Sequence, residues 1–75
     1  MITVMRLAER FKIIVWLVQY NGRVYRVTGP RRTRRERLTE FRYAICRATR
    51  LDASQFRHVD NVRVNGQWVS RWVVI

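Results

Sequence analysis

The sequence is poor in the residues that form disulfides, metal sites and catalytic nucleophiles. Its 75 residues include one cysteine, Cys46, and one histidine, His58. An intrachain disulfide is therefore excluded, and a structural zinc site of four Cys or His ligands cannot be assembled from this chain. A lone cysteine in the middle of a predicted helix is more typical of a packing residue than of a nucleophile. We therefore expect no enzymatic activity, no metal and no cofactor.

Long apolar runs are also absent. The longest run, residues 13–18, is six residues long, whereas a helix needs about 20 apolar residues to cross a bilayer. The segment that follows it, Gln19-Tyr20-Asn21, lacks the small residues of a signal-peptide cleavage site. These absences predict an intracellular protein with no membrane partner, located in the cytoplasm, or in the host cytoplasm if the protein is viral.

Acidic residues and lysine are scarce, whereas arginine is abundant. Five Asp and Glu stand against 16 Lys and Arg, which gives a formal net charge of +11, and every basic residue except Lys12 is arginine. The planar guanidinium group can hold a phosphate or a carboxylate with two hydrogen bonds and can stack on a base. Codon usage in a GC-rich genome would enrich arginine equally well. With 48% hydrophobic residues the chain is not a disordered basic tail, so the composition predicts a folded, cationic binding domain.

Two Asn-Gly dipeptides organise the chain. Asn21-Gly22 and Asn65-Gly66 each separate two runs rich in Val, Trp and Tyr, which is the strongest short-range signal of a β-hairpin with a type I′ turn. We expect the strands of these hairpins at residues 11–20 and 23–28, and at residues 58–64 and 67–74. For residues 1–10 the pattern fits a strand and also a helix that runs into the first strand.

A helix is predicted between the two hairpins. Gly29-Pro30 ends the first hairpin, and Thr33 and Glu36 have the spacing of a capping box. Apolar residues then recur at helical spacing until about residue 50, at Leu38, Phe41, Ala44, Ile45 and Ala48. The prediction is a single α+β domain over residues 1–75 with the order β-β-α-β-β. Its antiparallel sheet would have about four strands, with the helix packed on one face.

The strand faces suggest binding surfaces. The first predicted strand, residues 11–20, is apolar on both faces, as in a covered central strand or in an interface with another protein or with a second copy of the chain in a homodimer. In the second hairpin a two-residue turn places Arg63, Trp68 and Trp72 on one face and mainly valines on the other. We assign the valine face to the core and the Trp/Arg face to solvent. There the rings would stack on bases or anchor a protein partner; the alternative is that they pack inside the protein.

Arginines gather at the predicted start of the helix, at Arg31, Arg32, Arg34, Arg35 and Arg37, and Arg42 continues along its solvent flank. A helix N-terminus already carries about half a positive charge, so cations there destabilise the free protein. Together with the free backbone N–H groups, they would bind an anion such as phosphate. The alternative is a solvated loop in which like charges avoid one another.

These features favour a non-enzymatic nucleic-acid-binding protein, for DNA or RNA. The Arg-rich helix start would hold phosphates, and the Trp/Arg strand face would make further contacts. An alternative is a virus-encoded or accessory inhibitor or adaptor that binds an acidic host protein of a nucleic-acid machine, such as a polymerase or nuclease complex. A third is a structural component of a nucleoprotein particle. The candidate binding residues are Arg31, Arg32, Arg34, Arg35, Arg37, Arg42, Arg63, Trp68 and Trp72.

Overall fold

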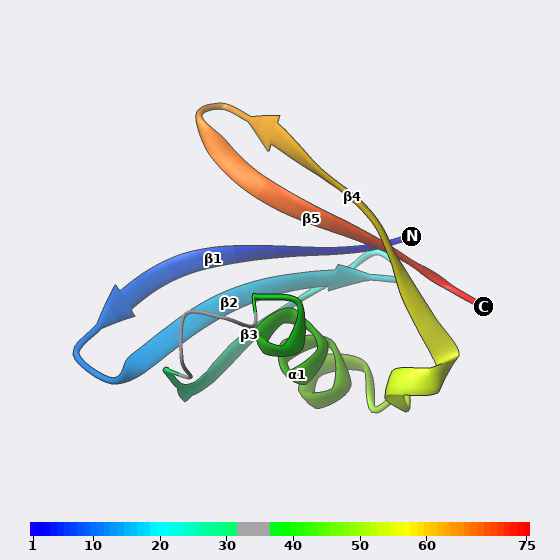
Figure 1. Cartoon of the computed structure of the whole chain (residues 1–75), viewed down its shortest axis with the longest axis horizontal. Coiled ribbons are helices and arrows are strands. Elements are labelled where there is room, and N and C mark those ends of the chain that lie inside the picture. Colours follow the sequence, from blue (N-terminus) through cyan, green and yellow to red (C-terminus); the bar gives the residue numbers. More distant parts are fainter. Residues whose placement is uncertain (32–36) are drawn as a thin grey trace.

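The computed structural model of the chain describes residues 1–31 and 37–75. Its strands form one antiparallel sheet of five strands in the order β3-β2-β1-β5-β4, with one helix on one face (Figure 1). The elements are β1 (Ile2–Arg10), β2 (Ile13–Tyr20), β3 (Arg23–Pro30), α1 (Arg37–Thr49), the 3-10 turn η1 (Ala53–Gln55), β4 (Phe56–Val64) and β5 (Gln67–Val74). The α+β class is confirmed, whereas the predicted number of four strands is one too few.

The additional strand is β1, in the segment for which the sequence left strand and helix open. β1 pairs with β2 along most of its length, and with β5 over Ile2, Thr3 and Val4. Ile2 and Val4 are fully buried, so the alternation of this segment is that of a central strand. The predicted start of a strand at Phe11 is therefore wrong, because Phe11 lies in the turn between β1 and β2.

The β1–β2 turn carries backbone strain. Phe11 has a φ of +57°, a left-handed conformation that costs an ordinary residue about 1–2 kcal/mol, and its side chain is 87% exposed. We expect Phe11→Gly to raise the free energy of unfolding by up to about 1 kcal/mol, measured by urea denaturation. Phe11→Ala is the control, because it removes the ring but keeps the Cβ atom. An equal gain in both variants would assign the effect to the ring and contradict this explanation.

Both Asn-Gly turns have the predicted geometry. Asn21 and Gly22 have φ values of 52° and 73°, and the second turn has a positive φ at both residues as well, as type I′ requires. The strand registers next to these turns are confirmed, with Tyr20 opposite Arg23 and Trp68 opposite Arg63.

The predicted faces of the second hairpin are reversed. The register shifts between His58 and Asp60, so Trp72 lies opposite His58 and not opposite Val59. On its other side Trp72 pairs with Ile2, which belongs to the core, and Trp72 is itself 0% exposed. The expectation that Trp72 faces solvent is therefore wrong. The pairing of β5 with β1 determines which face of β5 meets the core. This pairing joins segments that are distant in the sequence, so local sequence pattern does not reveal it.

Helix α1 packs against β1, β2 and β3. It buries Glu40, Ala44 and Ile45, which confirms part of the predicted apolar stripe, and ends at Thr49, close to the predicted residue 50. The predicted capping box, Thr33 and Glu36, lies outside the described residues. The buried hydrophobic residues are Ile2, Val4, Ile14, Trp16, Val18, Val27, Ala44, Ile45, Phe56 and Trp72. No helix in the described parts of the chain is long and apolar enough to cross a membrane.

The opposite face of the sheet lacks a covering element among the described residues. Strand β2 shows both environments, because Trp16 is fully buried on the helix side while Leu17, on the other side, is half-buried. Leu17 lies beside Met5, Val24 and Val69 in a shallow hollow of this open face. The two apolar faces of the predicted first strand thus correspond to a core face and an uncovered face.

Candidate nucleic-acid interface

The sheet divides where β1 and β5 separate. Their pairing covers three residue pairs and ends at Val4 and Ser70, beyond which the β4–β5 hairpin diverges from β1 (Figure 1). An open groove of about 490 Å³ lies between this hairpin and the first turns of α1. Its lining residues are Arg37, Leu38, Phe41, His58, Asn61, Trp68 and Ser70. A hollow of about 200 Å³ is lined by Arg6, Arg37, Phe41, Gln67 and Trp68. The two share three residues, and we call them together the Trp68 groove.

The groove has two walls from segments far apart in the sequence. Leu38 and Phe41 come from α1, and Trp68 comes from β5. His58 and Asn61 add polar groups from β4, with His58 Nε2 3.0 Å from Asn61 Oδ1. Residues three apart normally lie on opposite faces of a strand, but the register shift between His58 and Asp60 brings these two to the same face.

Trp68 is the exposed tryptophan of the chain. Its side chain is 57% exposed, whereas Trp16 and Trp72 are fully buried. The guanidinium carbon of Arg63 lies 5.6 Å from the Trp68 ring centroid, within the range of a cation–π contact. The structure therefore brings together Trp68 and Arg63, as the register predicts. The ring keeps much of its surface available to a ligand.

Trp72 and Arg42 lie next to the groove without forming its surface. Trp72 Nε1 donates a 2.8 Å hydrogen bond to Ser70 Oγ, and the guanidinium of Arg42 lies 5.5 Å from the Trp72 ring centroid. His58, which lines the groove, also contacts the Trp72 ring edge to face at 5.0 Å. Trp72 therefore supports the groove from inside the core, while Arg42 is exposed above it.

The predicted arginine cluster is described only at its two ends. Arg31 Nε lies 2.8 Å from a carboxylate oxygen of Glu9, and its backbone N–H donates to the carbonyl of Lys12 at 2.6 Å. Arg31 is exposed and is paired with the chain's own carboxylate, so less of its charge is available to an anion. Arg37 is exposed, lines the groove, and has no carboxylate partner among the described residues. Arg32, Arg34 and Arg35 lie outside the described residues.

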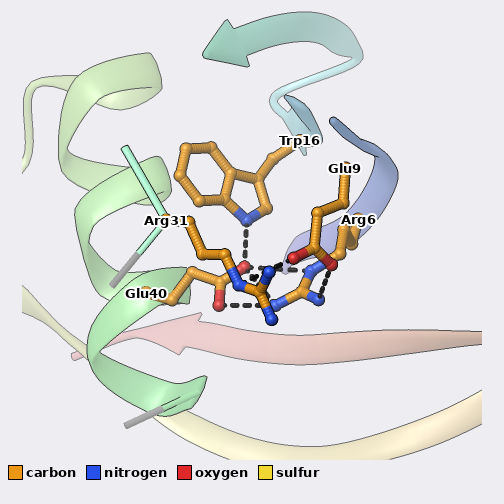
Figure 2. Close-up of polar contacts among 5 residues, drawn as sticks. All are labelled: Arg6, Glu9, Trp16, Arg31 and Glu40. Atoms are coloured by element: carbon orange, nitrogen blue, oxygen red, sulfur yellow. Dashed lines mark hydrogen bonds and ion pairs between the residues drawn. The ribbon is translucent and has the colours of Figure 1, made fainter. Parts of the chain in front are cut away.

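A network centred on the carboxylates of Glu9 and Glu40 joins the helix to the sheet (Figure 2). Glu40 is 6% exposed; one oxygen accepts hydrogen bonds from Trp16 Nε1 at 2.7 Å and Arg6 Nε at 3.1 Å, and the other accepts from Arg6 Nη2 at 2.7 Å. Arg6 also donates to Glu9 at 3.0 Å, and Glu9 binds Arg31. Glu9 thus pairs with Arg31, which follows β3, and Glu40 ties the first turn of α1 to β1. The sequence analysis did not predict this network. The signal for it is Glu40, an acidic residue four positions before Ala44 on the buried face of the helix.

The remaining described carboxylates, Asp52 and Asp60, are engaged away from the groove. Asp60 binds Arg71, and this guanidinium holds the pKa of Asp60 below its ordinary value. Asp52 accepts a hydrogen bond from Ser54 at η1. No described carboxylate lines the groove. Basic residues without a described carboxylate partner are Arg10, Lys12, Arg23, Arg26, Arg37, Arg42, Arg47, Arg50, Arg57 and Arg63.

The single cysteine and the single histidine lie on different elements, α1 and β4. Cys46 lies on α1, where burial and the charge of Asp52 raise the pKa of its thiol. A raised pKa keeps the thiol protonated, whereas a catalytic cysteine needs a lowered pKa. His58 lies on β4 and is engaged with Asn61.

Comparisons of the chain with protein families, with curated proteins and with solved structures found no significant match.

Proposed function

We propose that the protein binds nucleic acid through the Trp68 groove and the arginines that border it. The observation that supports this most directly is an exposed tryptophan in a groove that contains arginine and no described carboxylate. The remainder of the surface adds attraction, since the chain carries a net charge of +11. Such a surface attracts polyanions, and arginine binds phosphate with two hydrogen bonds.

The phosphate contacts are assigned to exposed arginines on both sides of the groove. Arg37 and Arg42 lie on α1, and Arg63 lies on β4 beside Trp68. None has a described carboxylate partner, so their charges are available to a ligand. Arg32, Arg34 and Arg35 lie two to five positions before Arg37 in the chain and extend the proposal by sequence alone.

The salt dependence of binding tests this assignment. We expect the logarithm of the affinity to fall linearly with the logarithm of the salt concentration, because each contacted phosphate releases a counterion. In the triple variant Arg37→Ala, Arg42→Ala, Arg63→Ala the magnitude of the slope should fall by about 2–3, and binding to all sequences should weaken similarly. Fluorescence anisotropy of a labelled oligonucleotide at several salt concentrations measures both quantities.

A control with the same loss of charge uses arginines away from the groove. Arg26 and Arg57 pair with Leu17 and Val73 and so lie on the opposite sheet face, and Arg23 follows the β2–β3 turn. The variant Arg23→Ala, Arg26→Ala, Arg57→Ala should change the slope by less than about 1. Equal changes in the two triple variants would show diffuse charge attraction, and no binding by the wild type would reject the function.

A second candidate function is binding to an acidic protein through the open sheet face. The specific observation is the uncovered apolar hollow formed by Met5, Leu17, Val24 and Val69, with Arg26 on the same face. Apolar contact would supply affinity, and charge would steer the encounter. A homodimer through this face is disfavoured because each copy carries +11. Affinity purification with and without nuclease separates the two functions, since a stoichiometric protein partner that survives nuclease would favour this second one.

A further inference from the structure

We infer that the Trp68 groove accommodates an unpaired base, so that the protein prefers single-stranded nucleic acid to duplex. This inference rests on the proposed function and names its substrate class. It follows from the two walls of the groove, the polar groups between them and the charges at their border.

The walls suit a flat, apolar ring. Phe41 and Leu38 on α1 lie across the groove from Trp68 on β5, and the groove volume of about 490 Å³ is within the range of small-ligand pockets, about 300–1,000 Å³. In a duplex both faces of a base are covered by its neighbours, so these side chains gain stacking contacts only from a base that has left the stack.

The polar groups suit the edge of a base. Asn61 uses its Oδ1 in the contact with His58, and its amide Nδ2 has no hydrogen-bond partner within the described part of the chain. A free amide N–H₂ group can donate to the carbonyl or ring nitrogen atoms that every base displays on its Watson–Crick edge. In a duplex that edge is occupied by the paired base, so this group also favours a single strand.

The charges lie where the backbone of a bound strand would leave the groove. Arg37 lines both parts of the groove at the α1 wall, and Arg63 lies against the Trp68 ring at the other wall. A nucleotide whose base lies between the walls would therefore have a guanidinium group on either side for its phosphates. Stacking with flanking arginine is the usual combination in proteins that bind single strands without strong sequence preference.

The test compares one labelled 12-nucleotide strand with the duplex of the same sequence, by anisotropy, for the wild type and three variants. Trp68→Ala should weaken single-strand binding about 5- to 100-fold and weaken duplex binding clearly less. Trp68→Phe should stay within about 3-fold of the wild type, because it keeps an aromatic face. Trp68→Leu is the matched control, since it keeps a large apolar group without that face, and it should behave like Trp68→Ala.

Intrinsic fluorescence gives an independent readout. Because Trp16 and Trp72 are fully buried, quenching of tryptophan emission by the unlabelled strand should come from Trp68. We expect quenching in the wild type and none in Trp68→Phe, although that variant still binds. Thermal melting followed by circular dichroism tests whether each variant is folded.

The outcomes separate this inference from the proposed function. If Trp68→Ala leaves single-strand affinity unchanged, or weakens single-strand and duplex binding equally, no base lies in the groove. The inference is then wrong, while salt-dependent binding that is lost in the Arg37, Arg42 and Arg63 triple variant still supports the function. Tighter binding of duplex than of the single strand also rejects the inference. If the wild type binds neither form at low salt, both are wrong.

Discussion

Replacement of Glu40 by alanine is expected to lower the free energy of unfolding by about 2–4 kcal/mol. Its carboxylate is buried and is the shared acceptor of Trp16 Nε1 and the Arg6 guanidinium, so the change leaves an indole N–H and part of a guanidinium without a partner. The side chain of Arg6 is 32% exposed, and water recovers some of the loss there. Small domains have a stability of only about 5–15 kcal/mol, so the change removes a large share of it. Urea denaturation followed by far-UV circular dichroism measures it.

Two further variants resolve the source of this effect. Glu40→Gln keeps an oxygen acceptor for Trp16 but loses the charge that Arg6 binds, and should therefore lie between the wild type and Glu40→Ala. Asp60→Ala breaks the other bidentate Arg–carboxylate pair, which is solvent-exposed on the open face, and should lower the free energy of unfolding much less than Glu40→Ala does. A loss at Asp60 as large as that at Glu40 would contradict the importance assigned to burial.

Two described carboxylates join separate elements of this small domain. Glu9 of β1 binds Arg31, which follows β3, and Glu40 of α1 binds Arg6 of β1. Arg37, Arg42 and Arg63, which border the groove, have no described carboxylate partner. The charge asymmetry around the groove follows directly from this distribution.

The parts of the fold that depend on local chemistry were predictable. Asn-Gly turns determine hairpin register, because a type I′ turn leaves only one pairing of the flanking residues. The pairs Trp16 with Val27 and Arg63 with Trp68 follow from this rule alone. The helix was also recognisable, since the spacing of Ala44 and Ile45 indicates its buried face.

The parts that depend on distant contacts were not predictable. Phe11 occupies a left-handed turn position without the usual glycine or asparagine, so the β1–β2 hairpin carries no sequence signal. Without β1, nothing indicates which face of β5 meets the core. The register shift between His58 and Asp60 also has no sequence signal, and it moves His58 to the face opposite to the one that the turn predicts. For these reasons Trp68 and Arg63 were found as a pair, but the groove wall from α1 opposite them was not.

Trp72→Ala is expected to lower the free energy of unfolding by about 3–5 kcal/mol, the range for removal of a large aromatic side chain from a core. Trp72 is fully buried, packs edge to face on Phe56 with ring centroids 5.7 Å apart, and donates a hydrogen bond to Ser70. Trp68→Ala should cost less than about 1 kcal/mol, because that side chain is 57% exposed. Thermal and urea denaturation of both variants test the difference.

The two tryptophans lie four residues apart on the same side of β5, so sequence pattern alone treats them as equivalent. The structure separates them, because Trp72 lies beneath His58 and Arg42 while Trp68 lies beyond the last β1–β5 pair. We therefore expect loss of folding from one substitution and loss of single-strand binding from the other. A Trp72→Ala variant with wild-type stability and weakened nucleic-acid binding would reverse this assignment and restore the ring to the binding surface.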